Sequence, residues 1–225
     1  MPKYMLLHAG VTGEMAPSDI PVSPSVDVDK LKEGDDAPIE VVVEVPASKS
    51  KRGWHYTEKA LQDIVDHVNE HTLNADLGHQ KPEDVSNEFR PPVTHWIGAK
   101  MVGKNAYFRG VVDAAAKDLK RWIRAGRIKQ VSIFGQASKQ QSMGETHVVG
   151  YKPLSIDWTP LDGMGRDTRI VAVGEMESLD DETEEGEETL TKEELLKAMK
   201  DMIEAEELTV KEILDALGVE LDEST

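Results

Sequence analysis

The aromatic side chains of this chain all lie in its first 158 residues, and its excess negative charge lies at its end. The 225-residue sequence has 3 Phe, 4 Trp and 4 Tyr, and the last of these is Trp158. Residues 171–225 carry 20 acidic and 4 basic side chains, whereas residues 1–170 carry 23 and 22. Because large apolar side chains supply most of a core, the folded domain has to form before the acidic end.

The composition excludes several classes of function. The chain has no Cys, so it can form neither disulfides nor thiolate metal sites, and we expect a reducing compartment. We expect no membrane partner, because no apolar run reaches the length of a membrane span and the N-terminus has no leader pattern. A net charge of −17 argues against a nucleic-acid partner.

The pattern along the chain predicts four regions. Residues 1–37 contain several Pro, Gly and Ser residues and are interpreted as a flexible N-terminal arm. Residues 38–176 are expected to form the main domain. Residues 177–190 are interpreted as an acidic linker, and residues 191–225 as a helical tail. This tail begins with a Thr-x-x-Glu capping box at Thr191 and carries leucines and methionines on one helical face.

Within the main domain, short β-branched runs alternate with glycine-containing turns, and two segments have helical periodicity. Helices are expected at 57–71, with Thr57 as the N-cap, and at 114–125, ending at Gly126. Strands are expected, in addition to a short one at 4–8, at 39–45, 95–102, 106–112, 129–135, 147–151, 154–159 and 169–173. Because most successive strands would form hairpins, the pattern predicts a mainly β, α+β fold, an antiparallel barrel or sandwich flanked by helices, and of the two we predict the antiparallel β-barrel.

A serine on one predicted strand is the first candidate for chemistry. In Val131-Ser132-Ile133-Phe134 the side chains alternate between the faces of the strand, so Ser132 and Phe134 leave on the face opposite to their aliphatic neighbours. A serine hydroxyl becomes a useful nucleophile only beside a base. Of the seven histidines, His79 has the most suitable context, between a helix and a strand hairpin, and His95 is the rival.

A serine–histidine pair also needs a group that orients the imidazole. Asp157 lies on a predicted strand among Ile156, Trp158 and Pro160, where a buried acid would need a partner. The opposing interpretation is an exposed polar row. A zinc site at His67 and His71, four residues apart on a predicted helix, is disfavoured because no third ligand is evident. We therefore expect no metal and no cofactor.

The order of these motifs resembles a known family. The motifs follow one another in the order seen in the prohead proteases of tailed bacteriophages. In sequence they are Leu73-Asn74-Ala75-Asp76, His79, the Trp96-to-Lys100 strand, Tyr107-to-Val111, the helix ending at Gly126 and Val131-to-Gly135. That family is similar in fold to the herpesvirus assemblins. The resemblance covers about residues 39–173, and it rests on order and spacing more than on any long motif.

The resemblance implies roles for individual residues. His79 matches the position of the general base and Ser132 that of the nucleophile. Asp157 matches the third member of the triad, although a register shift of two residues would give that role to Ser155. Gly165 and Arg166 match a Gly-Arg loop that helps to stabilise the oxyanion.

The resemblance also implies a function. A prohead protease is a serine endopeptidase that cleaves the major capsid protein and scaffold protein, and in some cases itself, inside the assembling procapsid in the host cytoplasm. It implies a homodimer and a scaffold-like role for the tail. The alternatives are a catalytically silent capsid assembly or scaffolding protein and, less favoured, a metal-dependent hydrolase.

Overall fold

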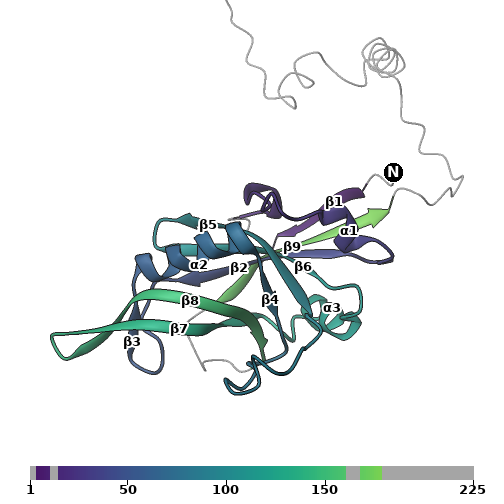
Figure 1. The fold of residues 1–225 in the computed structure, drawn as a ribbon. Coiled ribbons are helices and arrows are strands. Elements are labelled where there is room, and N and C mark those ends of the chain that lie inside the picture. The colour runs from purple at the N-terminus through teal and green to yellow at the C-terminus, as the bar shows by residue number, and fades with distance from the viewer. Residues whose placement is uncertain (1–3, 11–14, 161–167, 179–225) are drawn as a thin grey trace, which may run out of the picture. The chain divides into compact units, whose positions relative to one another are not determined.

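The computed structural model describes residues 4–10, 15–160 and 168–178 (Figure 1). The chain divides into two units, Met1–Asp181 and Glu182–Thr225, and the second lies outside the described residues. The strands of the first unit are β1 (Tyr4–Gly10), β2 (Ile39–Pro46), β3 (Trp54–Tyr56), β4 (Leu73–Ala75), β5 (Thr94–Val102), β6 (Asn105–Val112), β7 (Gln130–Ser142), β8 (Glu145–Thr159) and β9 (Arg169–Ser178). Its helices are the 3-10 helix η1 (Pro17–Asp19), α1 (Val28–Lys32), α2 (Glu58–His71) and α3 (Lys117–Arg124). No helix of the described residues is long and apolar enough to cross a membrane.

The strands form two sheets. The larger has the order β1-β9-β2-β6-β5-β4, and the smaller has the order β3-β8-β7. Every pairing is antiparallel except that of β3 with β8, which is parallel. A mainly β, α+β fold was predicted, and in this coarse respect the prediction is confirmed.

The predicted closed barrel is wrong. A barrel requires its first and last strands to pair, but within the described residues β1 and β4 end one sheet, and β3 and β7 end the other. An isolated parallel bridge between Leu77 and Trp158 joins the end of β4 to β8. Strand and hairpin patterns report only pairing between neighbours in sequence, so they could not show that the sheet edges stay apart.

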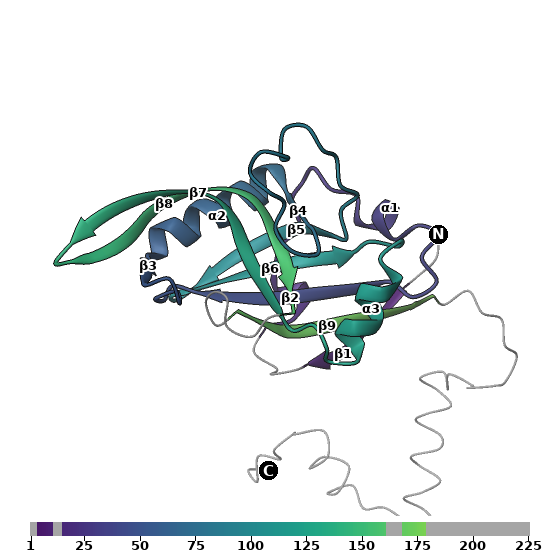
Figure 2. The ribbon, with the colours of Figure 1, turned by 90° about the horizontal axis from the view of Figure 1, so that it is seen from below.

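The predicted hairpin of β5 and β6, the helix α2 with Thr57 as its N-cap and the β-branched strand β2 are all present. The other strands differ from the prediction mainly in length. β7 continues to Ser142, and the two strands predicted near residue 150 are one strand, β8. Two β-bulges interrupt the register of β8 with β7, and Gly150 and Pro153 lie beside them. The tip of the resulting hairpin extends past β3 (Figure 2).

The main core lies between the two sheets and α2, which packs against β5 and β8. Its largest buried side chains include Trp96 and Trp158, whose ring centroids lie 5.9 Å apart. Each indole N–H has a partner: Trp96 donates to the carbonyl of Ile156 at 2.8 Å, and Trp158 donates to Thr94 Oγ1 at 2.9 Å. These bonds fix β5 against β8, the strand that carries Asp157.

The second face of the larger sheet is covered by residues 15–35. Ile20 is fully buried there beside Val42 and Tyr107. Gly98 permits the close approach, because a Cβ at this position would lie 2.0 Å from the carbonyl oxygen of Pro21. The described part of the segment interpreted as a flexible arm is therefore packed on the sheet, while the division of the chain at residues 37, 176 and 190 stays a prediction.

A buried ionic cluster ties this segment to the sheet. Glu40 on β2 lies 2.5 Å from Lys32 Nζ and 2.5 Å from Arg109 Nε, and the side chain of Glu40 is 1% exposed. Burial alone would raise the pKa of Glu40, but the hydrogen bond from Arg109 and the positive charge of Lys32 outweigh it and hold the pKa below its ordinary value. Arg109 also donates to the carbonyl of Ile20 at 3.1 Å.

Candidate active site

Two neighbouring strands place Ser132 and Asp157 side by side. Ser132 on β7 is directly opposite Asp157 on β8 in the strand register, so the two side chains share one face of the smaller sheet. The flanking Val131 is buried and Ile133 packs against the main core. This is the alternation predicted from the sequence. Ser132 is half-buried, and Asp157 is fully buried.

His79 reaches the same place from the segment after β4. The N–H of Gly78 donates to the carbonyl of Trp158 at 2.9 Å, and Trp158 N–H donates to the carbonyl of Asp76 at 2.9 Å. Gly78 has a φ of +82°, a left-handed conformation that residues with a Cβ rarely adopt. This turn along the edge of β8 delivers the imidazole beside Asp157.

The three side chains form a connected row. His79 Nδ1 lies 2.6 Å from Asp157 Oδ2, and His79 Nε2 lies 2.9 Å from Ser132 Oγ. Because a carboxylate accepts, Nδ1–H donates to Asp157, which leaves Nε2 to accept the Ser132 hydroxyl proton. Both distances fall within hydrogen-bond range, so the arrangement can remove a proton from Ser132 as its oxygen attacks a carbonyl.

The buried carboxylate of Asp157 has further donors. Its Oδ1 accepts from the backbone N–H of Asp76 at 2.9 Å, and its Oδ2 also accepts from Ser155 Oγ at 2.7 Å. Burial raises the pKa of Asp76, and the nearby charge of Asp157 raises it further. Ser155, the alternative third member, therefore contacts Asp157, and it is Asp157 that contacts His79.

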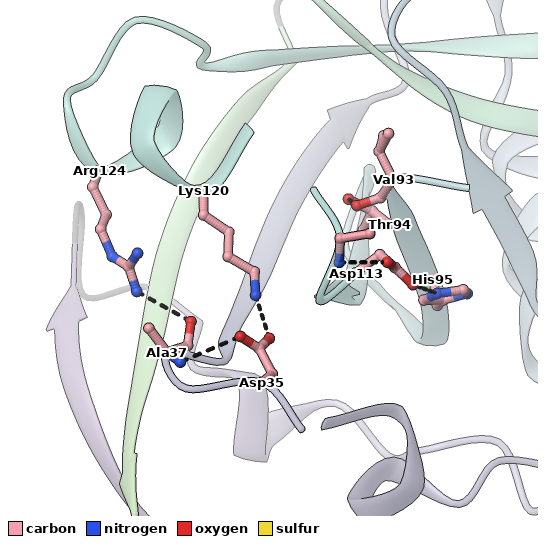
Figure 3. Close-up of polar contacts among 9 residues, drawn as sticks. Asp35, Ala37, Val93, Thr94, His95, Asp113, Lys120 and Arg124 are labelled. Atoms are coloured by element: carbon pink, nitrogen blue, oxygen red, sulfur yellow. Dashed lines mark hydrogen bonds and ion pairs between the residues drawn. The ribbon is translucent and has the colours of Figure 1, made fainter. Parts of the chain in front are cut away.

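The rival base His95 lies on β5 of the larger sheet. Figure 3 shows it directed at Asp113, and His95 Nε2 lies 2.9 Å from Asp113 Oδ2. Burial would raise the pKa of Asp113, but the hydrogen bonds from His95 and from the backbone N–H of Ala115, together with the positive charge of Lys120, hold this pKa below its usual value. The histidine that the structure brings to Ser132 is His79.

The candidate oxyanion residues, Gly165 and Arg166, lie outside the described residues, so their role stays a prediction. Within the described part of the chain, no group of three or more His, Asp and Glu side chains could hold a metal ion. His67 and His71 instead contact each other edge to face, with ring centroids 5.1 Å apart.

The structure adds two supporting residues that sequence reasoning missed. The ring of Phe134 stacks on His79 with centroids 5.0 Å apart, and the strand alternation had already placed it on the same face as Ser132. Gly135 allows β7 to pass the bulge in β8, because a Cβ there would lie 2.3 Å from the carbonyl oxygen of Lys152. The glycine was visible in the sequence, but the bulge that requires it was not.

Comparison with known proteins finds a likeness among solved structures. No protein-family model matches the chain, and no curated protein matches it. A solved structure, that of the bacteriophage T4 capsid assembly protease, gp21, is similar with a TM-score of 0.44 and 19% sequence identity, over 70% of this chain and 97% of that one.

Proposed function

We propose that this chain is a serine endopeptidase. The observation that carries the proposal is the row of Asp157, His79 and Ser132, joined by contacts of 2.6 and 2.9 Å. The order of these groups and the direction of their hydrogen bonds are what acyl transfer from a peptide requires. Burying a charged carboxylate costs free energy even when it accepts three hydrogen bonds, and a purely structural strand does not need such a group facing a half-exposed histidine and serine.

The geometry supports the following reaction. Ser132 Oγ attacks the carbonyl carbon of the scissile peptide while His79 Nε2 takes its proton. Asp157 holds the imidazole in the required tautomer and stabilises its positive charge. His79 then gives the proton to the leaving amine, and an acyl-enzyme remains on Ser132. Water then attacks the acyl carbon while His79 Nε2 takes its proton. As the bond between the acyl carbon and Ser132 Oγ breaks, His79 returns that proton to Ser132 and the carboxylic acid product leaves.

Stabilisation of the negatively charged intermediate is assigned to Gly165 and Arg166. Backbone N–H groups and a guanidinium directed at the developing oxyanion would each contribute on the order of 100- to 1000-fold. This assignment rests on the resemblance found in the sequence.

The edge of β7 supports a polypeptide as the substrate. Thr168 Oγ1 contacts both the N–H and the carbonyl oxygen of Val131, at 3.1 and 2.5 Å, so both groups point away from β8. By the alternation of an antiparallel strand, the backbone groups of Ile133 point to the same edge, directly beside Ser132, and beyond Thr168 no described strand pairs with this edge. An extended peptide could pair with that edge and present an internal bond to the serine.

As the biological substrates we propose segments of the major capsid protein and the scaffold protein. The reaction would take place in the host cytoplasm, inside the assembling procapsid, with the protease acting as a homodimer and with residues 191–225 as a scaffold-like tail. These assignments extend the resemblance of the sequence to prohead proteases. The alternative is a capsid assembly protein that keeps the fold without activity, and the short Ser132–His79 contact favours the enzyme.

Digestion of a peptide mixture tests the activity. The full-length protein, incubated with peptides derived from a bacterial proteome, should generate internal cleavages that mass spectrometry detects as new termini. The Ser132→Ala variant serves as the control and should generate none. Mass spectra of the protein itself over time would reveal self-cleavage near residues 177–190. A wild-type protein that cleaves nothing, or a variant that cleaves equally well, would contradict the proposal.

A further inference from the structure

The strand that carries Ser132 continues far beyond the candidate active site. β7 runs from Gln130 to Ser142 and pairs with β8 along its whole length. Residues Gln136–Tyr151, here called the arm, form the outer part of the β7–β8 hairpin, and the tip of this hairpin extends beyond β3 in both views (Figures 1 and 2). β3 pairs with the other edge of β8, so β7 is the outer strand of this sheet within the described residues.

Contacts made by β8 reveal which backbone groups of the arm face outward. The N–H of Tyr151 donates to Asp63 Oδ2 at 3.0 Å, and the carbonyl of Val148 accepts from Thr57. Both groups therefore point away from β7. In an antiparallel ladder, opposed residues turn their backbone groups outward together, so Ala137 and Lys139, the partners of Tyr151 and Val148, expose theirs at the free edge.

The outward-facing groups form one continuous row with the active site. They belong to alternate residues of β7, beginning next to Ser132: Ile133, Gly135, Ala137, Lys139 and Gln141. Outside the β7–β8 ladder, these backbone groups have no hydrogen bond with another described residue. From Ile133 to Gln141 the row is about 27 Å long at 3.4 Å per residue.

We propose that the arm is a docking strand for the polypeptide substrate, bound as an added antiparallel strand on the free edge from Ala137 to Gln141. This proposal rests on the serine endopeptidase function proposed above. β7 runs from Ser132 toward the tip of the arm, so an antiparallel partner runs from the tip toward Ser132. The docked residues are therefore those on the N-terminal side of the scissile bond.

The composition of the arm indicates which class of substrate its free edge can bind. Its outer strand, Gln136–Ser142, carries one charge, Lys139, whose Nζ lies 3.5 Å from the centroid of the Trp54 ring. Recognition on this edge depends on backbone hydrogen bonds more than on side chains, so it tolerates many sequences but demands an extended segment. The substrate is a chain with roughly eight unfolded residues before the cleaved bond.

Peptide length provides the first test. In the proteome-derived mixture, wild-type protein should cleave peptides with eight or more residues before the scissile bond on the order of tenfold faster than peptides with three, because several backbone hydrogen bonds are gained. Length after the scissile bond should matter little. If the rate depends on the length after the scissile bond, or does not depend on peptide length at all, the proposal is wrong.

A pair of variants at one position isolates the backbone contribution. Lys139→Pro removes an outward N–H and places a ring on the free edge, while leaving the β7–β8 hydrogen bonds intact. Lys139→Ala removes the same side chain but keeps the N–H. The proline variant should lose most of the length preference, with cleavage of short peptides unchanged, and the alanine variant should retain it. Equal behaviour of two folded variants would contradict the proposal.

A scan with backbone-methylated peptides uses only the wild-type protein and so does not depend on the folding of a variant. N-methylation at successive residues before the scissile bond should slow cleavage at every second residue. Ser132-dependent cleavage without this alternation would refute the docking strand alone. Absence of any cleavage would refute both proposals. If light scattering shows a dimer that Lys139→Pro dissociates, the edge binds a second copy and the proposal is wrong.

Discussion

The Ser132→Ala variant should hydrolyse peptides about 10⁶-fold more slowly than the wild-type protein, the loss expected when the nucleophile of a triad is removed. Ser132 is half-buried and its hydroxyl contacts His79 at 2.9 Å, so the melting temperature should change little. His79→Ala should lower kcat nearly as much, because an unassisted serine hydroxyl is a weak nucleophile. Steady-state kinetics on one cleaved peptide measures both.

The residues of the row should act as a unit. The double variant Ser132→Ala/His79→Ala should therefore be no slower than either single variant. Asp157→Asn should lower kcat about 10⁴-fold, because an amide favours the wrong imidazole tautomer. Ser155→Ala removes one of the three donors to Asp157 and should lower kcat about tenfold. Additive losses, or an Asp157→Asn variant that keeps its full rate, would contradict this assignment.

The Glu40→Ala variant should lower the free energy of unfolding by about 3–5 kcal/mol, because it leaves buried positive charge without its partner. The side chain of Lys32 is 3% exposed and that of Arg109 is 16% exposed, and each lies 2.5 Å from the Glu40 carboxylate. Chemical denaturation measures the loss. Glu145→Ala is the matched control, because Glu145 pairs with Lys49 at 3.2 Å on the surface, where removal of an ion pair changes stability little. Similar losses in the two variants would contradict the stabilising role of the buried cluster.

The same cluster predicts a pH dependence. The folded protein holds the pKa of Glu40 below its ordinary value, so the charged carboxylate stabilises the fold above the pKa of the unfolded chain. That contribution is lost as the pH falls through the lower, folded-state pKa. The wild-type free energy of unfolding should therefore decrease more steeply in acid than that of Glu40→Ala. Parallel curves would show that Glu40 does not contribute to this dependence.

Local strand order was enough to single out Ser132 and Asp157 as candidates, and their catalytic roles stay a prediction. A period-two strand separated Ser132 and Phe134 from Val131 and Ile133, and β8 offered Asp157 on a strand of the same kind. The choice between Asp157 and Ser155 was not predictable, because residues two apart share one face of a strand. The contacts that separate them, from His79 to Asp157 and from Ser155 to Asp157, depend on a pairing between distant segments.

The order of the strands in the larger sheet was not predictable for the same reason. β2 pairs with β9, which places Val41 opposite Val173, and no hairpin signal reports a pairing over such a separation. The continuous β-branched run of β2 does reveal burial on both faces: Val41 and Val43 enter the main core, whereas Val42 enters the second one. What covers that second face, the segment around Ile20, carried only proline and polar signals in the sequence.

Reaction with a fluorophosphonate probe tests the central claim, an activated Ser132, most directly. The wild-type protein should be labelled at Ser132, as located by peptide mass spectrometry, because His79 accepts the hydroxyl proton. Ser132→Ala should not be labelled, and His79→Ala should be labelled far more slowly. A wild-type protein that reacts no faster than His79→Ala, or that is labelled at another serine, would contradict the account.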